Sequence, residues 1–98
     1  MTGTSRTSEG LDARRRKLLF RSWRRGMREM DLILGSFADA EIETMSADDL
    51  DQYERLLEIN DTELLPWITG QNPVPAGLGL PILHRVLEWR GKVASATV

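Results

Sequence analysis

Cysteine is absent from this chain of 98 residues, and histidine occurs once, as His84. Without thiols the protein has no disulfide, no thiolate metal site and no cysteine nucleophile. A single imidazole also excludes a metal centre built on several histidines. No apolar run approaches the roughly 20 residues that a membrane-spanning helix needs. The chain is therefore expected to form one small domain with no membrane insertion and no metal.

The two ends of the chain have compositions that predict tails. Residues 1–10 are rich in serine, threonine and glycine and lack the apolar core of a secretion signal. Their short length and Glu9 also argue against an organelle transit peptide. We expect residues 1–10 to form a disordered tail, residues 11–91 to form a single domain and residues 92–98 to form a second disordered tail. These features predict a cytoplasmic protein.

Charge is unevenly distributed, although the net charge is only −2. Residues 1–30 hold nine basic and three acidic residues, a net charge of +6. Residues 31–79 hold eleven acidic residues and one base, Arg55, which gives −10. Segregation of this kind favours oriented association with a partner.

Apolar residues recur at helical spacing along most of the chain, and no segment alternates as a β-strand does. The clearest example is the i, i+3, i+4, i+7 series of Met30, Ile33, Leu34 and Phe37. We predict an all-α fold, a compact five-helix bundle. The expected segments are a helix with Asp12 as its N-cap that runs to about Arg24, a helix through Met30–Phe37, a short acidic turn or helix over 39–45, a helix after Ser46, a short helix after Asn60 and a last helix from Pro81 to Gly91.

Several residues mark the ends and irregularities of these helices. Ser46, followed by two aspartates, is a good N-cap. Pro66 lacks the N–H that an interior helical position needs, so the helix around Trp67 is expected to be short or kinked. Residues 70–79 contain two prolines and three glycines and are expected to form an extended loop.

The segment from Arg24 to Asp31 is the most distinctive part of the chain, because arginines meet a glycine and then acidic residues. Gly26 can end the first helix as a residue with positive φ. It can equally be the N-cap of the second helix, with Glu29 reaching back to its N–H. Both interpretations predict a charged corner between two helices.

This corner suits docking onto another protein better than it suits catalysis. A guanidinium is a planar fork that pairs with carboxylate or phosphate, and two adjacent arginines point to different sides. One of Arg24 and Arg25 can therefore hold a partner while the other braces the bundle. Gly26 leaves room for a partner's backbone to approach. The alternative is that Glu29 and Gly26 only terminate helices.

Arg25-Gly26-Met27-Arg28-Glu29 resembles the Arg-Gly-x-x-Glu motif of the succinate dehydrogenase flavin assembly factors. The resemblance covers about residues 12 to 90. It includes a basic first helix before the motif, and Asp31 two places after the glutamate. A leucine-rich helix with Leu56-Leu57 and a tryptophan near the start of a short helix, here Trp67, complete it.

The resemblance implies a non-enzymatic bacterial assembly factor, a monomer when free. It implies binding to the flavoprotein subunit of succinate dehydrogenase and promotion of covalent FAD attachment to that subunit. No cofactor is expected to stay bound to this chain, and whether fumarate reductase is also served is left open. The motif assigns docking to Arg25, Gly26 and Glu29, and we extend the same surface to Arg24, Arg28 and Asp31.

Two other classes of function fit the sequence less well. The arginines of the first helix could contact phosphates in nucleic acid, but the −10 of residues 31–79 would repel a polyanion, and no aromatic stacking platform accompanies the bases. An enzyme would need a nucleophile, a base and an oxyanion site, and the sequence contains no such set.

Overall fold

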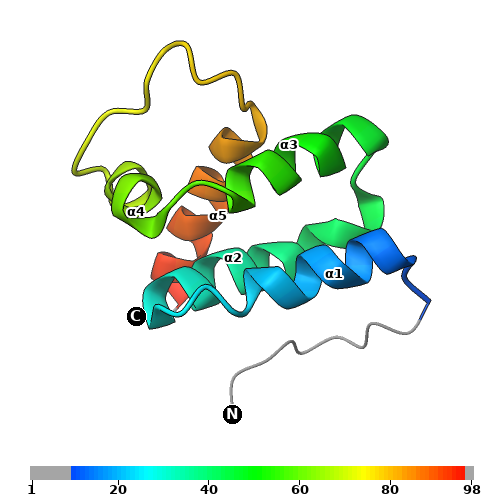
Figure 1. The fold of residues 1–98 in the computed structure, drawn as a ribbon. Helices are drawn as coiled ribbons and strands as arrows, with labels where there is room; N and C mark the ends of the chain where they lie inside the picture. Colours follow the sequence, from blue (N-terminus) through cyan, green and yellow to red (C-terminus); the bar gives the residue numbers. More distant parts are fainter. Residues whose placement is uncertain (1–9, 97–98) are drawn as a thin grey trace.

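The computed structural model describes residues 10–96, and side chains as far as Gly91. The described chain contains α-helices, one 3-10 turn and no strand, which confirms the all-α five-helix prediction (Figure 1). The elements are α1 (Ala13–Ser22), α2 (Arg28–Glu41), η1 (Ile42–Thr44), α3 (Ala47–Leu57), α4 (Asp61–Thr69) and α5 (Ile82–Ala96).

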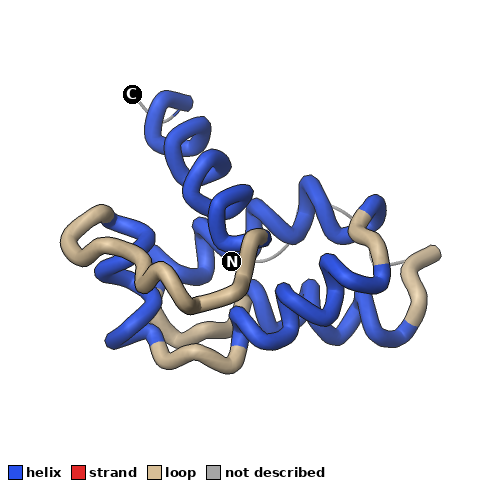
Figure 2. Tube along the Cα trace, turned by 90° about the horizontal axis from the view of Figure 1, so that it is seen from above, coloured by secondary structure: helices blue, strands red, loops and turns tan. Residues whose placement is uncertain are grey.

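The helices pack in two layers. Helices α1 and α2 lie side by side in one layer, and α3 and α4 lie across from them in Figure 1. Helix α5 contacts α2, α3 and α4, so it joins the layers from behind. Figure 2 shows α5 running out of the bundle at a steep angle to the others. The loop over 70–81 forms an open arch between α4 and α5 (Figure 1).

Residues of every helix meet in one apolar core, where the rings of Phe37 and Tyr53 lie 5.7 Å apart between centroids. The expected face of α2 is buried at Met30, Leu34 and Phe37, while Ile33 is only partly buried. The largest fully buried side chains are Tyr53, Phe37, Leu18, Met30, Leu34, Ile42, Met45, Leu56, Leu64, Ile82, Leu83 and Val86.

Polar contacts inside this core tie α1, α2 and α3 together. The Ser22 hydroxyl donates to the Leu18 carbonyl at 2.8 Å and shares a hydrogen bond of 2.6 Å with the Tyr53 hydroxyl, which also lies 3.2 Å from the Leu34 carbonyl. Burial raises the pKa of Tyr53, although the Ser22 contact opposes the shift. The phenol therefore remains neutral, and both buried hydroxyls have partners, as buried polar groups require.

Several expected helix ends are confirmed. Asp12 caps α1 by accepting from the Arg15 backbone N–H at 3.2 Å. Ser46 and Asp49 cap α3 reciprocally. Helix α4 has only nine residues and contains Pro66.

Two expected ends were wrong. Helix α1 stops at Ser22, not near Arg24. Gly91 does not close the last helix, which continues to Ala96 because one glycine costs only about 1 kcal/mol in a helix. Residues 92–96 thus belong to α5, whereas residues 1–9 and 97–98 of the expected tails lie outside the described residues.

Candidate functional site

The corner between α1 and α2 is a loop over 23–27 that turns at Gly26. Gly26 has φ of +95°, a conformation that residues with a Cβ rarely adopt. A Cβ added there would meet no atom within 4 Å, so the glycine lies against open space. Both proposed roles for Gly26 were wrong, because Trp23 is the C-cap of α1 and Met27 is the N-cap of α2.

At the start of α2, Asp31 bonds to the backbone of the preceding loop, whereas the sequence suggested Glu29 for that role. Met27 makes no side-chain cap, and Glu29 is exposed, without a hydrogen bond to any described residue. Asp31 instead accepts from the Arg25 backbone N–H at 2.6 Å. The sequence misled because a capping box needs its acid three residues after the cap, and Glu29 is only two residues after Met27. Glu29 is therefore free for contacts outside the chain.

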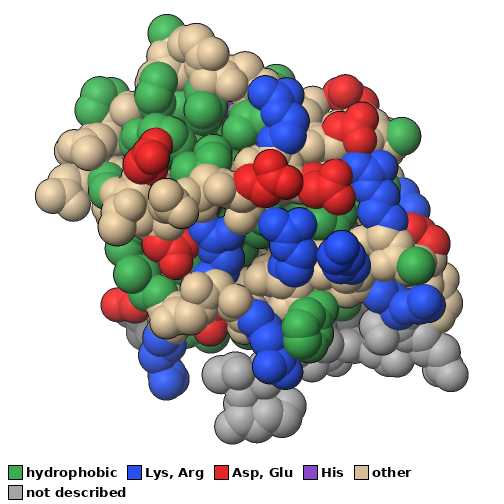
Figure 3. Space-filling view, viewed as in Figure 1, with side chains coloured by type: hydrophobic (Ala, Val, Ile, Leu, Met, Phe, Trp, Pro, Cys, Tyr) green, Lys and Arg blue, Asp and Glu red, His purple; other side chains and the backbone are tan. Residues whose placement is uncertain are grey.

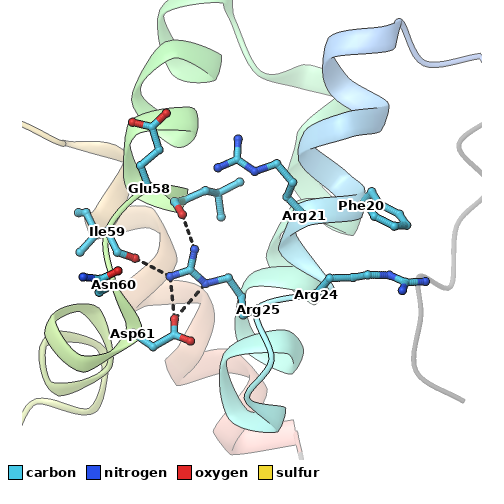
Figure 4. Close-up of a pocket in the computed structure, with 9 residues that line it drawn as sticks. Phe20, Arg21, Arg24, Arg25, Glu58, Ile59, Asn60 and Asp61 are labelled. Atoms are coloured by element: carbon cyan, nitrogen blue, oxygen red, sulfur yellow. Dashed lines mark hydrogen bonds and ion pairs between the residues drawn. The ribbon is translucent and has the colours of Figure 1, made fainter.

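Arg25 points inward and joins the corner to the turn between α3 and α4. Its Nε and Nη2 atoms donate to Asp61 at 3.0 and 2.7 Å. Nη2 also donates to the Ile59 carbonyl at 2.6 Å, and Nη1 donates to the Leu57 carbonyl (Figure 4). The Arg25 side chain is only 11% exposed. Its guanidinium is thus committed to bracing the bundle.

The adjacent arginine behaves differently. Arg24 is exposed, and its guanidinium carbon lies 4.4 Å from the centroid of the Phe20 ring, a cation–π contact. Phe20 is itself 58% exposed, which is unusual for a large apolar side chain in this protein. Of the two adjacent arginines, Arg25 therefore braces the bundle and Arg24 faces solvent.

We use the name exposed corner for four solvent-exposed residues of the motif region: Arg24, Gly26, Arg28 and Glu29. The two other expected site residues, Arg25 and Asp31, lie behind it, half-buried and bonded to each other. All six residues are thus brought together, four as surface and two as support.

A tryptophan packs behind the exposed corner in a way that the sequence did not reveal. A Cβ placed on Gly35 would lie 2.2 Å from Cδ2 of Trp23, so only glycine leaves space for the indole on α2. The Trp23 Nε1 donates to Asp39 at 3.3 Å. The absence of a side chain at Gly35 therefore lets Trp23 pack closely on α2.

A polar cleft of about 410 Å³ lies beside the exposed corner. The end of α1 and the loop after it contribute Arg21, Arg24 and Arg25 to it, and the turn after α3 and the start of α4 contribute Glu58, Asn60 and Asp61 (Figure 4). Asp61 and this cleft were missed from the sequence, because their closeness to the motif depends on the packing of distant segments.

Among residues 10–96, no cluster of three or more histidine, cysteine or acidic side chains is placed to hold a metal ion. Within the same described part of the chain, no helix is both long and apolar enough to span a bilayer. His84 is exposed on α5.

Comparison with known proteins gives consistent matches. A sequence model of the family described as "Flavinator of succinate dehydrogenase" matches residues 16–89. The chain is 41% identical over 80 residues to "FAD assembly factor SdhE" of Acetobacter pasteurianus, covering 82% of this chain and 73% of that protein. It is 40% identical over 72 residues to "Succinate dehydrogenase assembly factor 2, mitochondrial" of Danio rerio, covering 71% and 46%.

The corresponding mitochondrial protein of Aspergillus flavus is 38% identical over 68 residues, which cover 69% of this chain. The chain spans only 23% of that protein's length and less than half of the Danio rerio protein. The matched region begins within α1, contains the whole corner and ends in α5. On the extent of the family match and these identities, the chain belongs to the succinate dehydrogenase flavin assembly factor family.

Proposed function

We propose that this protein binds the flavoprotein subunit of succinate dehydrogenase and promotes covalent attachment of FAD to it. The printed names of the relatives, FAD assembly factor and succinate dehydrogenase assembly factor, support this role. The protein acts as a binding partner and not as an enzyme. FAD becomes attached to the flavoprotein and is not held stably by this chain.

The observation that carries the proposal is the open surface at Gly26. The glycine has positive φ and nothing near its missing Cβ, while Arg25 and Asp31 hold the loop from behind. A rigid, uncovered stretch of backbone lets a partner's main chain come close without ordering a flexible loop first. Arg24, Arg28 and Glu29 border this stretch and supply charges of both signs for orientation.

The free protein is proposed to be a monomer in the bacterial cytoplasm. Fumarate reductase is a second candidate flavoprotein for binding at the exposed corner. Nucleic acid is not favoured as a ligand, since Arg14 and Arg15 of α1 already form ion pairs with Asp51 and Asp12, each at 2.6 Å. Paired arginines leave fewer free cations for phosphates.

Glu29→Gln tests the proposal, because Glu29 has no hydrogen-bond partner among the described residues. We expect the melting temperature to stay unchanged and the covalent flavin on the partner to fall, since an unpaired partner charge in an interface costs about 2–5 kcal/mol. The measurement is thermal unfolding of the purified variant, together with flavin fluorescence of the flavoprotein band from cells that carry it.

Glu88→Gln is the matched control, because Glu88 is also an exposed helical glutamate but lies on α5. It should leave both flavin content and melting unchanged. Normal flavin attachment with Glu29→Gln would contradict a docking role for this residue. Normal flavin attachment in cells that lack the protein altogether would contradict the proposed function itself.

A further inference from the structure

The cleft beside the exposed corner contains one arginine, Arg21, without a partner in the described part of the chain. Arg21 is half-buried at the end of α1, and its side chain points toward the end of α3 in Figure 4. It forms no hydrogen bond or ion pair with any residue that the structure describes. Arg25, in the same cleft, has its donors occupied by Asp61 and two carbonyls.

Two other arginines of α1, Arg14 and Arg15, are bonded within the fold. Arg14 pairs with Asp51 and approaches Glu54 at 3.4 Å, and Arg15 binds Asp12 and two backbone carbonyls. Figure 3 shows basic side chains along α1 facing acidic side chains along α3. Against this pattern, Arg21 is a partly desolvated cation whose five donors meet no acceptor among the residues that the structure describes. Such a group favours an anion supplied from outside the chain.

The opposite wall of the cleft adds a second hydrogen-bond donor, Asn60, and one unpaired carboxylate, Glu58. Asn60 is the N-cap of α4, yet its side chain makes no capping bond, so its amide is available. Glu58 is exposed at the mouth of the cleft and has no ion pair among the described residues. Asp61 is neutralised by Arg25 at 2.7 Å. The unpaired charges of the cleft are thus Arg21 and Arg24 against Glu58, a surplus of one positive charge.

We propose that this cleft binds a carboxylate side chain from an acidic segment of the flavoprotein, immediately beside the exposed corner. Arg21 is the main ligand, Asn60 is a second donor, and Arg24 lies at the rim on the Phe20 ring. Glu58 opposes a second negative charge and so restricts where the acidic segment can lie. This inference rests on the proposed function and adds to it the chemistry that the partner must present.

The first test measures affinity for the purified flavoprotein subunit that lacks covalent FAD. We expect Arg21→Gln to weaken binding roughly tenfold, since arginine is among the residues that dominate interface energy. Lys17→Gln is the control, because Lys17 is an exposed cation of α1 outside the cleft. It should change affinity less than about twofold. Equal effects from the two variants, or none from Arg21→Gln, would overturn the proposal.

A second variant predicts a change of opposite sign. Glu58→Gln removes the competing carboxylate and is expected to tighten binding about twofold, the scale of an exposed charge. Weaker binding with this variant would mean that the cleft receives a basic segment, which would overturn the proposal. The two variants together exclude a purely structural explanation, because simple destabilisation would weaken binding in both.

A third measurement tests the cleft without the flavoprotein. Hexaglutamate is titrated into the wild-type protein, and the Nε–Hε NMR signals of the arginines are followed. Shifts at Arg21 larger than at Arg90, an exposed arginine of α5, would support the proposal. No shift at Arg21, or a stronger response to pyrophosphate than to hexaglutamate, would overturn it. If wild type fails to bind the flavoprotein at all, the proposed function fails, and this titration alone decides the cleft.

Discussion

The turns before α2 and α3 each lead into a helix. The side chains that bond to the turn before α3 are close to it in sequence, whereas the turn before α2 also bonds to a residue far away in sequence. Before α3, Ser46 and Asp49 bond to each other's backbone across three residues. Before α2, Met27 has no side-chain cap, and the turn depends on Arg25 reaching Asp61, 36 residues away. The first turn is stabilised locally, whereas the second adds tertiary packing to the local hydrogen bond between the Arg25 N–H and Asp31.

This difference matters because the second turn carries the exposed corner. A locally capped helix start keeps its shape even when the rest of the fold fluctuates. The corner at Gly26 is also held by the contact of Arg25 with the segment that joins α3 and α4. Its conformation is therefore a property of the whole bundle, and substitutions far from it in sequence should alter it.

The largest effect is expected from Arg25→Ala, which removes the link between the two turns. It leaves Asp61 and the carbonyls of Leu57 and Ile59 without this donor, and loss of a partly buried charged partner costs about 3 kcal/mol. Urea unfolding measures the change. Arg24→Ala is the control and should cost less than about 0.5 kcal/mol, because Arg24 is exposed. Similar losses in the free energy of unfolding for both variants would mean that the contact of Arg25 with Asp61 contributes little to stability.

A smaller loss is expected from Gly35→Ala, which tests the packing behind the corner. The new Cβ would overlap the Trp23 ring, and overpacking costs about 1–3 kcal/mol. That outweighs the gain of up to about 1 kcal/mol in helix propensity. The double variant Gly35→Ala with Trp23→Leu should recover part of the loss in thermal unfolding. A stabilised single variant would show that the ring can move aside freely.

Gly26 should separate stability from function. A residue with a Cβ at this φ costs about 1 kcal/mol, and the site has room for it. Gly26→Arg should thus remain folded but fail to support covalent flavin attachment to the partner. Gly70→Arg is the matched control, since Gly70 also has positive φ and open space but ends α4. Loss of flavin attachment with both variants would point to backbone strain and not to blocked docking.

The smallest effect is expected at the locally capped turn. Ser46→Ala should lower the free energy of unfolding by about 1 kcal/mol, and Ser46→Gly by only a few tenths. Flavin attachment should be unaffected, because Ser46 lies at the opposite end of α3 from the residues that Arg25 contacts. Chemical denaturation of both variants, beside flavin fluorescence of the partner, checks this order. A functional loss with Ser46→Ala would remove the distinction between the two turns.

The same distinction explains how far the sequence could be interpreted. Apolar spacing predicted the bundle and the buried face of α2, and local capping signals predicted the starts of α1 and α3. The family resemblance pointed to the motif, and all six expected site residues lie together around the corner. The role of Asp61, the cleft at Arg21 and the C-terminal end of α5 were missed. The first two depend on segments that meet only in the folded chain.

The contact between Trp23 and Gly35 constrains how this corner can change over evolutionary time. The indole occupies the volume that any other side chain at position 35 would fill. A larger residue can be accepted there only if position 23 has first become smaller or has turned outward to solvent. Across related proteins, the two positions should therefore vary as a pair, although they lie on opposite sides of the motif. Their combined size, and not either residue alone, should be the quantity that selection holds steady.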